Sequence, residues 1–153
     1  MTDSIREQII QNFQASLRNI RKNNGYQFDL DYSSVKRGDT LSVDTDVMPA
    51  IYIFEGDERI IDREHAGRDS LILELDVNIE IWCSDADNLS RTANNLEADI
   101  VKAVMADYTR GGLAMYTERL GTTPFFIEGS AVGGRIASFF VRYEALEHDP
   151  YNS

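Results

Sequence analysis

The stretch Ser70–Cys83, SLILELDVNIEIWC, decides the fold, because its side chains alternate between two chemical classes. Every second residue from Leu71 to Ile81 is aliphatic, and the residues between them are mainly acidic, with Ile72 and Trp82 at the two ends. A period of two over this length predicts one long strand with one face in the core. Since a buried parallel strand is apolar on both faces, the pattern favours the centre of an antiparallel sheet.

Two amphipathic segments are expected to cover that aliphatic face. Ser4 and Glu7 have the spacing of a capping box, and apolar residues then recur at helical spacing. This predicts a first helix over about 4–23, ended by Asn24-Gly25. A second apolar stripe follows the acidic cap at Ser84-Asp85 and predicts a helix over about 86–108.

The rest of the chain alternates between short extended segments and turns. Turns are predicted at 35–39 and 131–134, and the segment 113–120 is ambiguous but favours an extended form. The remaining predicted strands are 26–32, 40–43, 50–54, 124–129 and 135–146. Together these segments predict an α+β fold: a mixed, mainly antiparallel sheet with two amphipathic helices packed on one face.

The length and composition favour one domain over 1–153, because about 150 residues are enough to bury a core without disulfides. The single cysteine, Cys83, is expected to be a small buried apolar side chain. No stretch is apolar enough to cross a membrane and no secretion signal is present, so we expect no membrane partner. The formal charge of −11 disfavours a protein that grips nucleic acid.

The run 56–69, GDERIIDREHAGRD, is the most charged part of the chain. It joins two predicted strands, so it is expected to be an exposed charged loop or the tip of a hairpin. Such a loop is either functional or simply solvated, and the residues alone leave both readings open.

Motifs for catalysis or cofactor binding are missing from the sequence. One cysteine and two distant histidines, His65 and His148, do not suit a zinc site or a nucleophilic triad. The glycine-rich segment near Gly133 lies between two predicted strands and not before a helix, so it does not suit a phosphate loop. We therefore predict no catalytic residue, no cofactor and no metal, and a protein that is not an enzyme.

One acidic cluster leaves open the alternative that the protein is a metal-dependent nuclease. Glu74, Asp76 and Glu80 share one face of the central strand, where neighbouring acids lie about 6.6 Å apart. Two of them could hold Mg²⁺ in a nuclease. The favoured interpretation is a solvent or interface surface, with Arg142 or Arg135 across from a carboxylate. It predicts a positive partner, or water, beside each of these three acids.

Several stretches resemble the tail terminator (tail completion) proteins of long-tailed bacteriophages. The resemblance lies in the order of the segments and in their residue patterns along nearly the whole chain, and no single motif is diagnostic. The segments that carry it are IREQIIQNF (5–13), VKRGDT (35–40), PAIYIFEGDE (49–58), LELDVNIEIW (73–82) and VRYEALEHDPYNS (141–153).

The resemblance implies a structural protein that forms a ring, usually of six copies, on the end of the tail tube. Such a ring ends tube polymerisation and offers the surface for head joining. The implied partners are the chain itself, the tail tube protein and a head-completion or neck protein. The implied location is the head-proximal end of the virion tail, after assembly in the cytoplasm of the bacterial host.

Genomic DNA would pass through such a ring without specific binding, and an acidic channel suits that task. The residues predicted to line the channel or an interface are Glu55, Asp57, Glu58, Asp62, Glu64, Glu74, Asp76 and Glu80. Three alternatives remain open: another head–tail connector, neck or tail-tube component, a binding module from outside phage, and the carboxylate-dependent nuclease.

Overall fold

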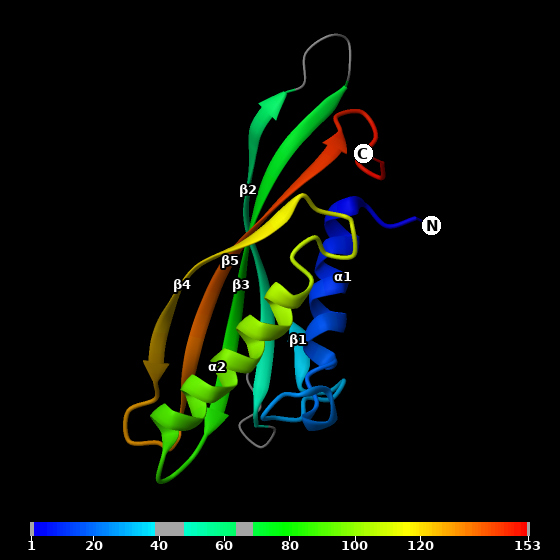
Figure 1. Ribbon diagram of the computed structural model, residues 1–153. Helices are drawn as coiled ribbons and strands as arrows, with labels where there is room; N and C mark the ends of the chain where they lie inside the picture. Colours follow the sequence, from blue (N-terminus) through cyan, green and yellow to red (C-terminus); the bar gives the residue numbers. More distant parts are fainter. Residues whose placement is uncertain (1, 39–47, 64–68, 153) are drawn as a thin grey trace.

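The computed structural model describes residues 2–38, 48–63 and 69–152. Two helices and five strands make up the fold, together with one short 3-10 turn at Lys22–Asn24 (Figure 1). Their bounds are α1 Ile5–Arg18, β1 Val35–Arg37, β2 Ala50–Arg63, β3 Ser70–Ser84, α2 Leu89–Ala106, β4 Tyr116–Phe126 and β5 Val132–Leu146.

The five strands form one sheet in the order β1-β2-β3-β5-β4, with β3 at its centre. β3 is antiparallel to both neighbours, β2 and β5, and β4 is antiparallel to β5. The short strand β1 runs parallel to β2, which makes the sheet mixed. This confirms the predicted α+β class and the central place of the Ser70–Cys83 stretch.

Both helices pack on the same face of the sheet (Figure 1). The alternate residues Leu75, Val77, Ile79 and Ile81 of β3 face this layer and are fully buried. The core continues across β5 through every second residue from Ala137 to Ala145. Cys83 is also buried, and burial raises the pKa of its thiol, as expected of a structural cysteine.

Both helices are shorter than predicted. α1 begins as expected, with the Ser4 hydroxyl accepting a hydrogen bond from the Glu7 amide at 3.2 Å. It ends at Arg18, and the 3-10 turn occupies the last residues of the predicted helix. α2 begins at Leu89 because Asp85 binds the Asn88 amide in the preceding turn. It ends at Ala106, so Tyr108 lies outside it and is exposed.

The predicted first strand, 26–32, is wrong. Instead of pairing with a strand, this segment is tied to α2 by Asp99, whose carboxylate accepts hydrogen bonds from the amides of Gln27 and Phe28, each at 2.9 Å. The aliphatic side chain of Leu30 is buried under the helices. The alternation of polar and apolar residues in 26–32 therefore does not mark a strand. It belongs to a segment whose backbone is bound by a helix residue and whose apolar side chain is buried.

The strand ends also differ from the sequence expectations. The predicted turn at 35–39 contains β1, while the predicted short strand at 40–43 lies outside the described residues. β2 continues to Arg63, so much of the predicted charged loop 56–69 is strand, and β2 and β3 form the predicted hairpin. The expected segments 113–120 and 124–129 contribute to one strand, β4. β5 begins at Val132, within the predicted 131–134 turn.

Candidate functional site

The acidic face of β3 is matched by two arginines on the neighbouring strands. The Arg142 guanidinium donates to Glu74 at 2.6 Å, and the Arg59 guanidinium reaches the other Glu74 oxygen at 3.1 Å. Arg59 also donates to both oxygens of Asp76 at 2.9 Å. Glu74 and Asp76 are therefore joined by one guanidinium, in the bidentate geometry that suits a carboxylate.

The strand register explains this arrangement. Glu74 lies opposite Arg59 on β2 and opposite Arg142 on β5, so three charged residues cross the sheet in one row. Arg142 was one of the two predicted cross-strand partners, and it is confirmed. The alternative partner, Arg135, is wrong, because it lies opposite Ile81 on the helix-bearing face and donates to Asn94 of α2 at 2.8 Å.

The ion pairs hold both carboxylates in the charged form. The Arg142 hydrogen bond is the largest influence on Glu74 and lowers the pKa of that carboxyl. The Arg59 hydrogen bond does the same for the pKa of Asp76. A general base needs a raised pKa near neutrality, so these carboxylates are not tuned for that role.

The third acid of the row, Glu80, has a different partner. Its carboxylate accepts a hydrogen bond from the Trp82 indole at 2.5 Å. The Trp82 ring in turn meets the edge of Phe125 of β4, with ring centroids 4.7 Å apart. The prediction of a positive partner is thus confirmed for Glu74 and Asp76, while Glu80 is bound by a neutral donor.

A second acidic cluster lies on the opposite, helix-bearing face. Glu55 lies opposite Val77, and Glu58 lies opposite Leu75 after a bulge in β2. Arg6 of α1 bridges the two, at 2.9 Å from Glu55 and 3.5 Å from Glu58. The predicted acidic residues therefore do not form one surface, since the sheet separates this pair from Glu74 and Asp76.

Two further contacts complete the second cluster. Arg37 of β1 lies 2.6 Å from Glu55 and 2.6 Å from Glu7 of α1. Partial burial alone would raise the pKa of Glu55, but the hydrogen bonds from Arg6 and Arg37 lower it. The Tyr143 hydroxyl donates to Glu58, and burial together with this bond raises the tyrosine pKa.

The remaining predicted residues lie on or near the distal part of β2. Asp57 and Asp62 are exposed, and Asp62 accepts a hydrogen bond from the Arg63 amide at 2.8 Å. Glu64 lies outside the described residues. This part of β2 is tied to the C-terminal segment by the ion pair between Arg63 and Glu147 at 2.8 Å.

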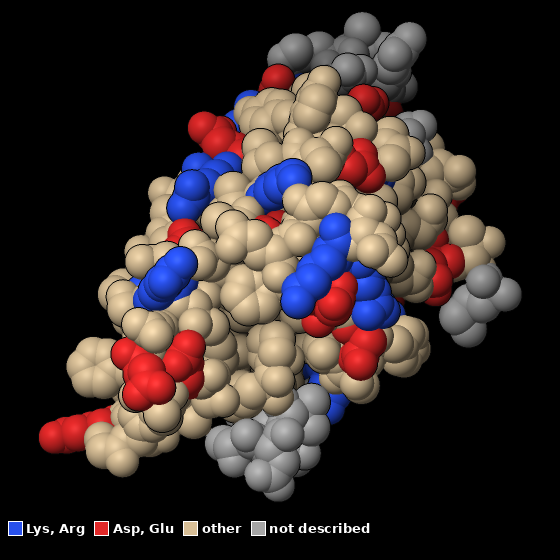
Figure 2. Space-filling view, turned by 60° about the horizontal axis from the view of Figure 1, so that its bottom comes forward, with Lys and Arg blue, Asp and Glu red and all other residues tan. Residues whose placement is uncertain are grey.

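The surface charge is mixed despite the net charge of −11. On the side seen in Figure 2, basic and acidic side chains are interspersed between broad uncharged areas, with no continuous field of one sign. Ion pairs such as Arg119 with Glu97, at 2.8 Å, distribute the charge in this way. A phosphate-binding surface needs clustered Lys and Arg, and this view offers none.

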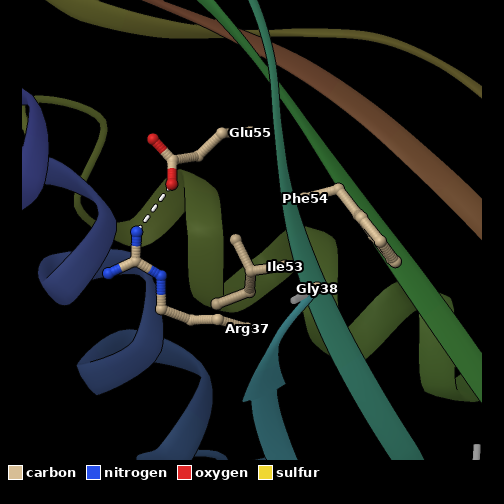
Figure 3. Close-up of a pocket in the computed structure, with 5 residues that line it drawn as sticks. All are labelled: Arg37, Gly38, Ile53, Phe54 and Glu55. Carbon is tan, nitrogen blue, oxygen red and sulfur yellow. Dashed lines mark hydrogen bonds and ion pairs between the residues drawn. The ribbon is translucent and has the colours of Figure 1, made fainter. Parts of the chain in front are cut away.

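A pocket of about 370 Å³ opens where β1 ends beside β2 (Figure 3). Its described lining is Arg37, Gly38, Ile53, Phe54 and Glu55. Gly38 is required there, because a Cβ atom would lie 2.2 Å from a ring carbon of Phe54. The Arg37–Glu55 ion pair and the Phe54 ring lie on opposite sides of β2.

Within 2–38, 48–63 and 69–152, no three His, Cys, Asp or Glu side chains are grouped so as to hold a metal ion. Among the described helices, none is both long and apolar enough to span a membrane.

Sequence reasoning missed the arginines that organise both clusters. From the sequence, Arg6 is a polar residue of the predicted first helix, Arg37 lies in a predicted turn and Arg59 lies in the charged run. A signal was present for Arg59, since a hairpin that pairs β2 with β3 up to the charged run places it near Glu74. No local signal links Arg6 with Glu55, which are 49 residues apart.

Comparison with known proteins identifies a similar fold and no family. No family model matches the chain, and no curated protein matches it. Among solved structures, the chain is similar to a chain of the virion of a native gene transfer agent particle. The TM-score is 0.51 at 16% identity, and the match covers 93% of this chain and 92% of that chain.

Proposed function

We propose that this protein is a structural component of a phage-like virion, and specifically a tail terminator. Copies of the chain form a ring, expected to have six members, on the head-proximal end of the tail tube. The ring ends tube polymerisation and offers the surface that joins the head. Its partners are other copies of the chain, the tail tube protein and a neck or head-completion protein.

One observation carries the virion assignment. Nearly the whole chain shares its fold with a virion component of a gene transfer agent, over 93% of one chain and 92% of the other. The finer assignment, to the tail terminator, rests on the segment order that resembles that family. Fold likeness at 16% identity supports a shared architecture and leaves the position in the particle to experiment.

The chemistry of the acidic residues fits an assembly role better than catalysis. Glu74 and Asp76 are bound by arginines and keep lowered pKa values. We propose that the protein is not an enzyme. Mg²⁺-dependent cleavage of DNA that is lost in Asp76→Ala would contradict this and favour the nuclease.

We propose that fewer acidic residues line the channel than the sequence predicts. Ion pairs offset much of the charge of Glu55, Glu58, Glu74 and Asp76. We therefore assign the repulsion of passing DNA first to Asp57 and Asp62, which are exposed on β2. A ring with these residues on its outer rim would contradict this assignment.

Deletion of the gene tests the termination role. Particles without the chain are expected to carry tails of irregular and excessive length, measured by electron microscopy, and a plasmid copy should restore one length. Normal tails in the deletion strain would exclude termination. Normal tails that fail to join heads would favour a neck or connector component instead.

A further inference from the structure

The sheet ends in two edges that are open in the described part of the chain. β4 forms one edge over its 11 residues. At the other edge, β1 pairs with β2 only at Ile51–Ile53, so within the described residues Phe54–Arg63 has no strand on that side. An open edge presents unpaired N–H and C=O groups, and the group that matches them is another strand.

The two edges carry complementary features at the same height of the sheet. Leu120 lies in the β4 bulge between Arg119 and Gly121, which pair with Phe139 and Ser138 of β5. These two residues pair with Val77 and Asn78 of β3, which in turn pair with Glu55 and Phe54 of β2. Leu120 at one edge is therefore level with the Figure 3 pocket at the other.

Leu120 is suited to fill such a pocket. It is 57% exposed in the isolated chain, although edge strands are commonly protected by charged side chains. The pocket has a volume of about 370 Å³, and Phe54 and Gly38 are among its lining residues. Pro124 lacks an N–H group, so strand pairing at the β4 edge is favoured in the other half, Tyr116–Leu120.

Strand direction also permits the contact. β4 is antiparallel to β2, because β2 and β5 run the same way on either side of β3. A second copy placed beside the first, without being turned over, brings its β4 antiparallel to the open part of β2. Contacts between different surfaces form rings when the rotation closes, and matching heights avoid the rise that gives a filament.

We propose that the Leu120 side chain of one copy occupies the Figure 3 pocket of the next copy. In this contact β4 lies beside the open edge of β2. This interface rests on the proposed ring and names the surfaces that build it. The apolar side chain meets the Phe54 ring on one side of β2, and the Arg37–Glu55 ion pair flanks the contact on the other side of that strand. The contact is head-to-tail, so each copy uses both surfaces.

Leu120→Glu tests the contact, and Phe126→Glu is the matched control. Phe126 is 74% exposed on the same strand, but it lies level with Cys83, near the lower end of the sheet. In native mass spectrometry of the purified chain, Leu120→Glu should weaken self-association at least about tenfold, because a charge replaces a buried apolar group. Phe126→Glu should assemble like the wild type. Equal effects of both variants would overturn the proposal.

Cross-linking tests the contact in assembled particles, including the case in which the chain joins its neighbours only on the tube. With Cys83→Ala as background, one copy carries Phe54→Cys and the other Leu120→Cys. We expect a mixed disulfide after mild oxidation. Homodimers of the Leu120→Cys copy alone would indicate a two-fold contact and overturn the proposal.

The interface and the termination role can fail separately. If the deletion strain has irregular tails and the particles give no mixed disulfide, the interface is wrong and the termination role stands. If the deletion strain has tails of normal length and the mixed disulfide forms, the interface stands and the termination role is wrong.

Discussion

The two faces of β3 are made by the same 15 residues, but different interactions hold them in place. On the helix-bearing face, Leu75 to Ile81 bury aliphatic side chains completely. On the other face, Glu74 and Asp76 are held by guanidinium groups from β2 and β5. Apolar burial stabilises a fold strongly, whereas exposed ion pairs add little net stability.

This difference assigns the two faces of β3 to different tasks. The aliphatic face stabilises the fold, and the charged face is available for function. A change on the aliphatic face disturbs the whole core, because β3 lies between β2 and β5 and its aliphatic side chains belong to the core cluster under the helices. A change on the charged face alters the surface chemistry while the core persists. The charged face is therefore free to meet a neighbour, a partner or a channel.

The largest expected effect is on the aliphatic face. Leu75→Ala removes a fully buried side chain and should lower the free energy of unfolding by about 2–5 kcal/mol. Glu80→Gln, on the opposite face of β3, is the matched control and should change it little, since the amide oxygen can still accept from Trp82. Chemical denaturation measures both, and equal losses would remove the distinction between the faces.

A second test addresses the end of the charged face near Trp82, where β3 and β5 pack tightly against each other. Gly134 pairs with Trp82, and an added Cβ would lie 1.6 Å from the carbonyl oxygen of Ile81. Gly134→Ala should therefore force β3 and β5 apart and cost about 1–3 kcal/mol in thermal or chemical denaturation. Unchanged stability would mean that the strands are farther apart than described.

The charged face should control stability in acid. Because arginines lower the pKa values of Glu74 and Asp76 below their ordinary 4.5 and 3.8, the folded state holds fewer protons than the unfolded state in that range. Their contribution is present above about pH 4.5 and is lost as pH falls through the lowered values. The double variant Glu74→Gln, Asp76→Asn should flatten this part of the curve of stability against pH. A curve that keeps its slope would place the acid sensitivity elsewhere, for example at Glu55.

The smallest effect is expected for Arg59→Gln. Arg59 is exposed and bridges two carboxylates, so its loss should lower the denaturation midpoint much less than Leu75→Ala does. High salt should reduce the difference from the wild type, because salt screens exposed charges. A loss as large as that of Leu75→Ala would show that the ion pairs hold β2 on the sheet.

Periodicity predicted the parts of the fold that tertiary contacts do not override. The alternation in Ser70–Cys83 identified the central strand, and the helical stripes identified both helices. Short segments were less predictable. The polar alternation in 26–32 looks like a strand, but a distant buried carboxylate, Asp99, binds its amides.

The candidate site was predictable only in part, for a related reason. Glu74 and Arg142 lie on two strongly patterned strands, so Arg142 could be named from the sequence as one of two candidate partners. The division of the acids between two faces was not predictable. It depends on the continuation of β2 through a charged run and on the bulge between Glu55 and Glu58, neither of which has a period.

The central claim is that copies of this chain form one ring at the head-proximal end of the tail tube. A three-dimensional reconstruction of isolated tails by electron microscopy tests it most directly. We expect density for this fold in a single closed ring at that end, with β4 of each copy beside β2 of the next. Density for the fold repeated along the tube, or missing from the tail, would contradict it.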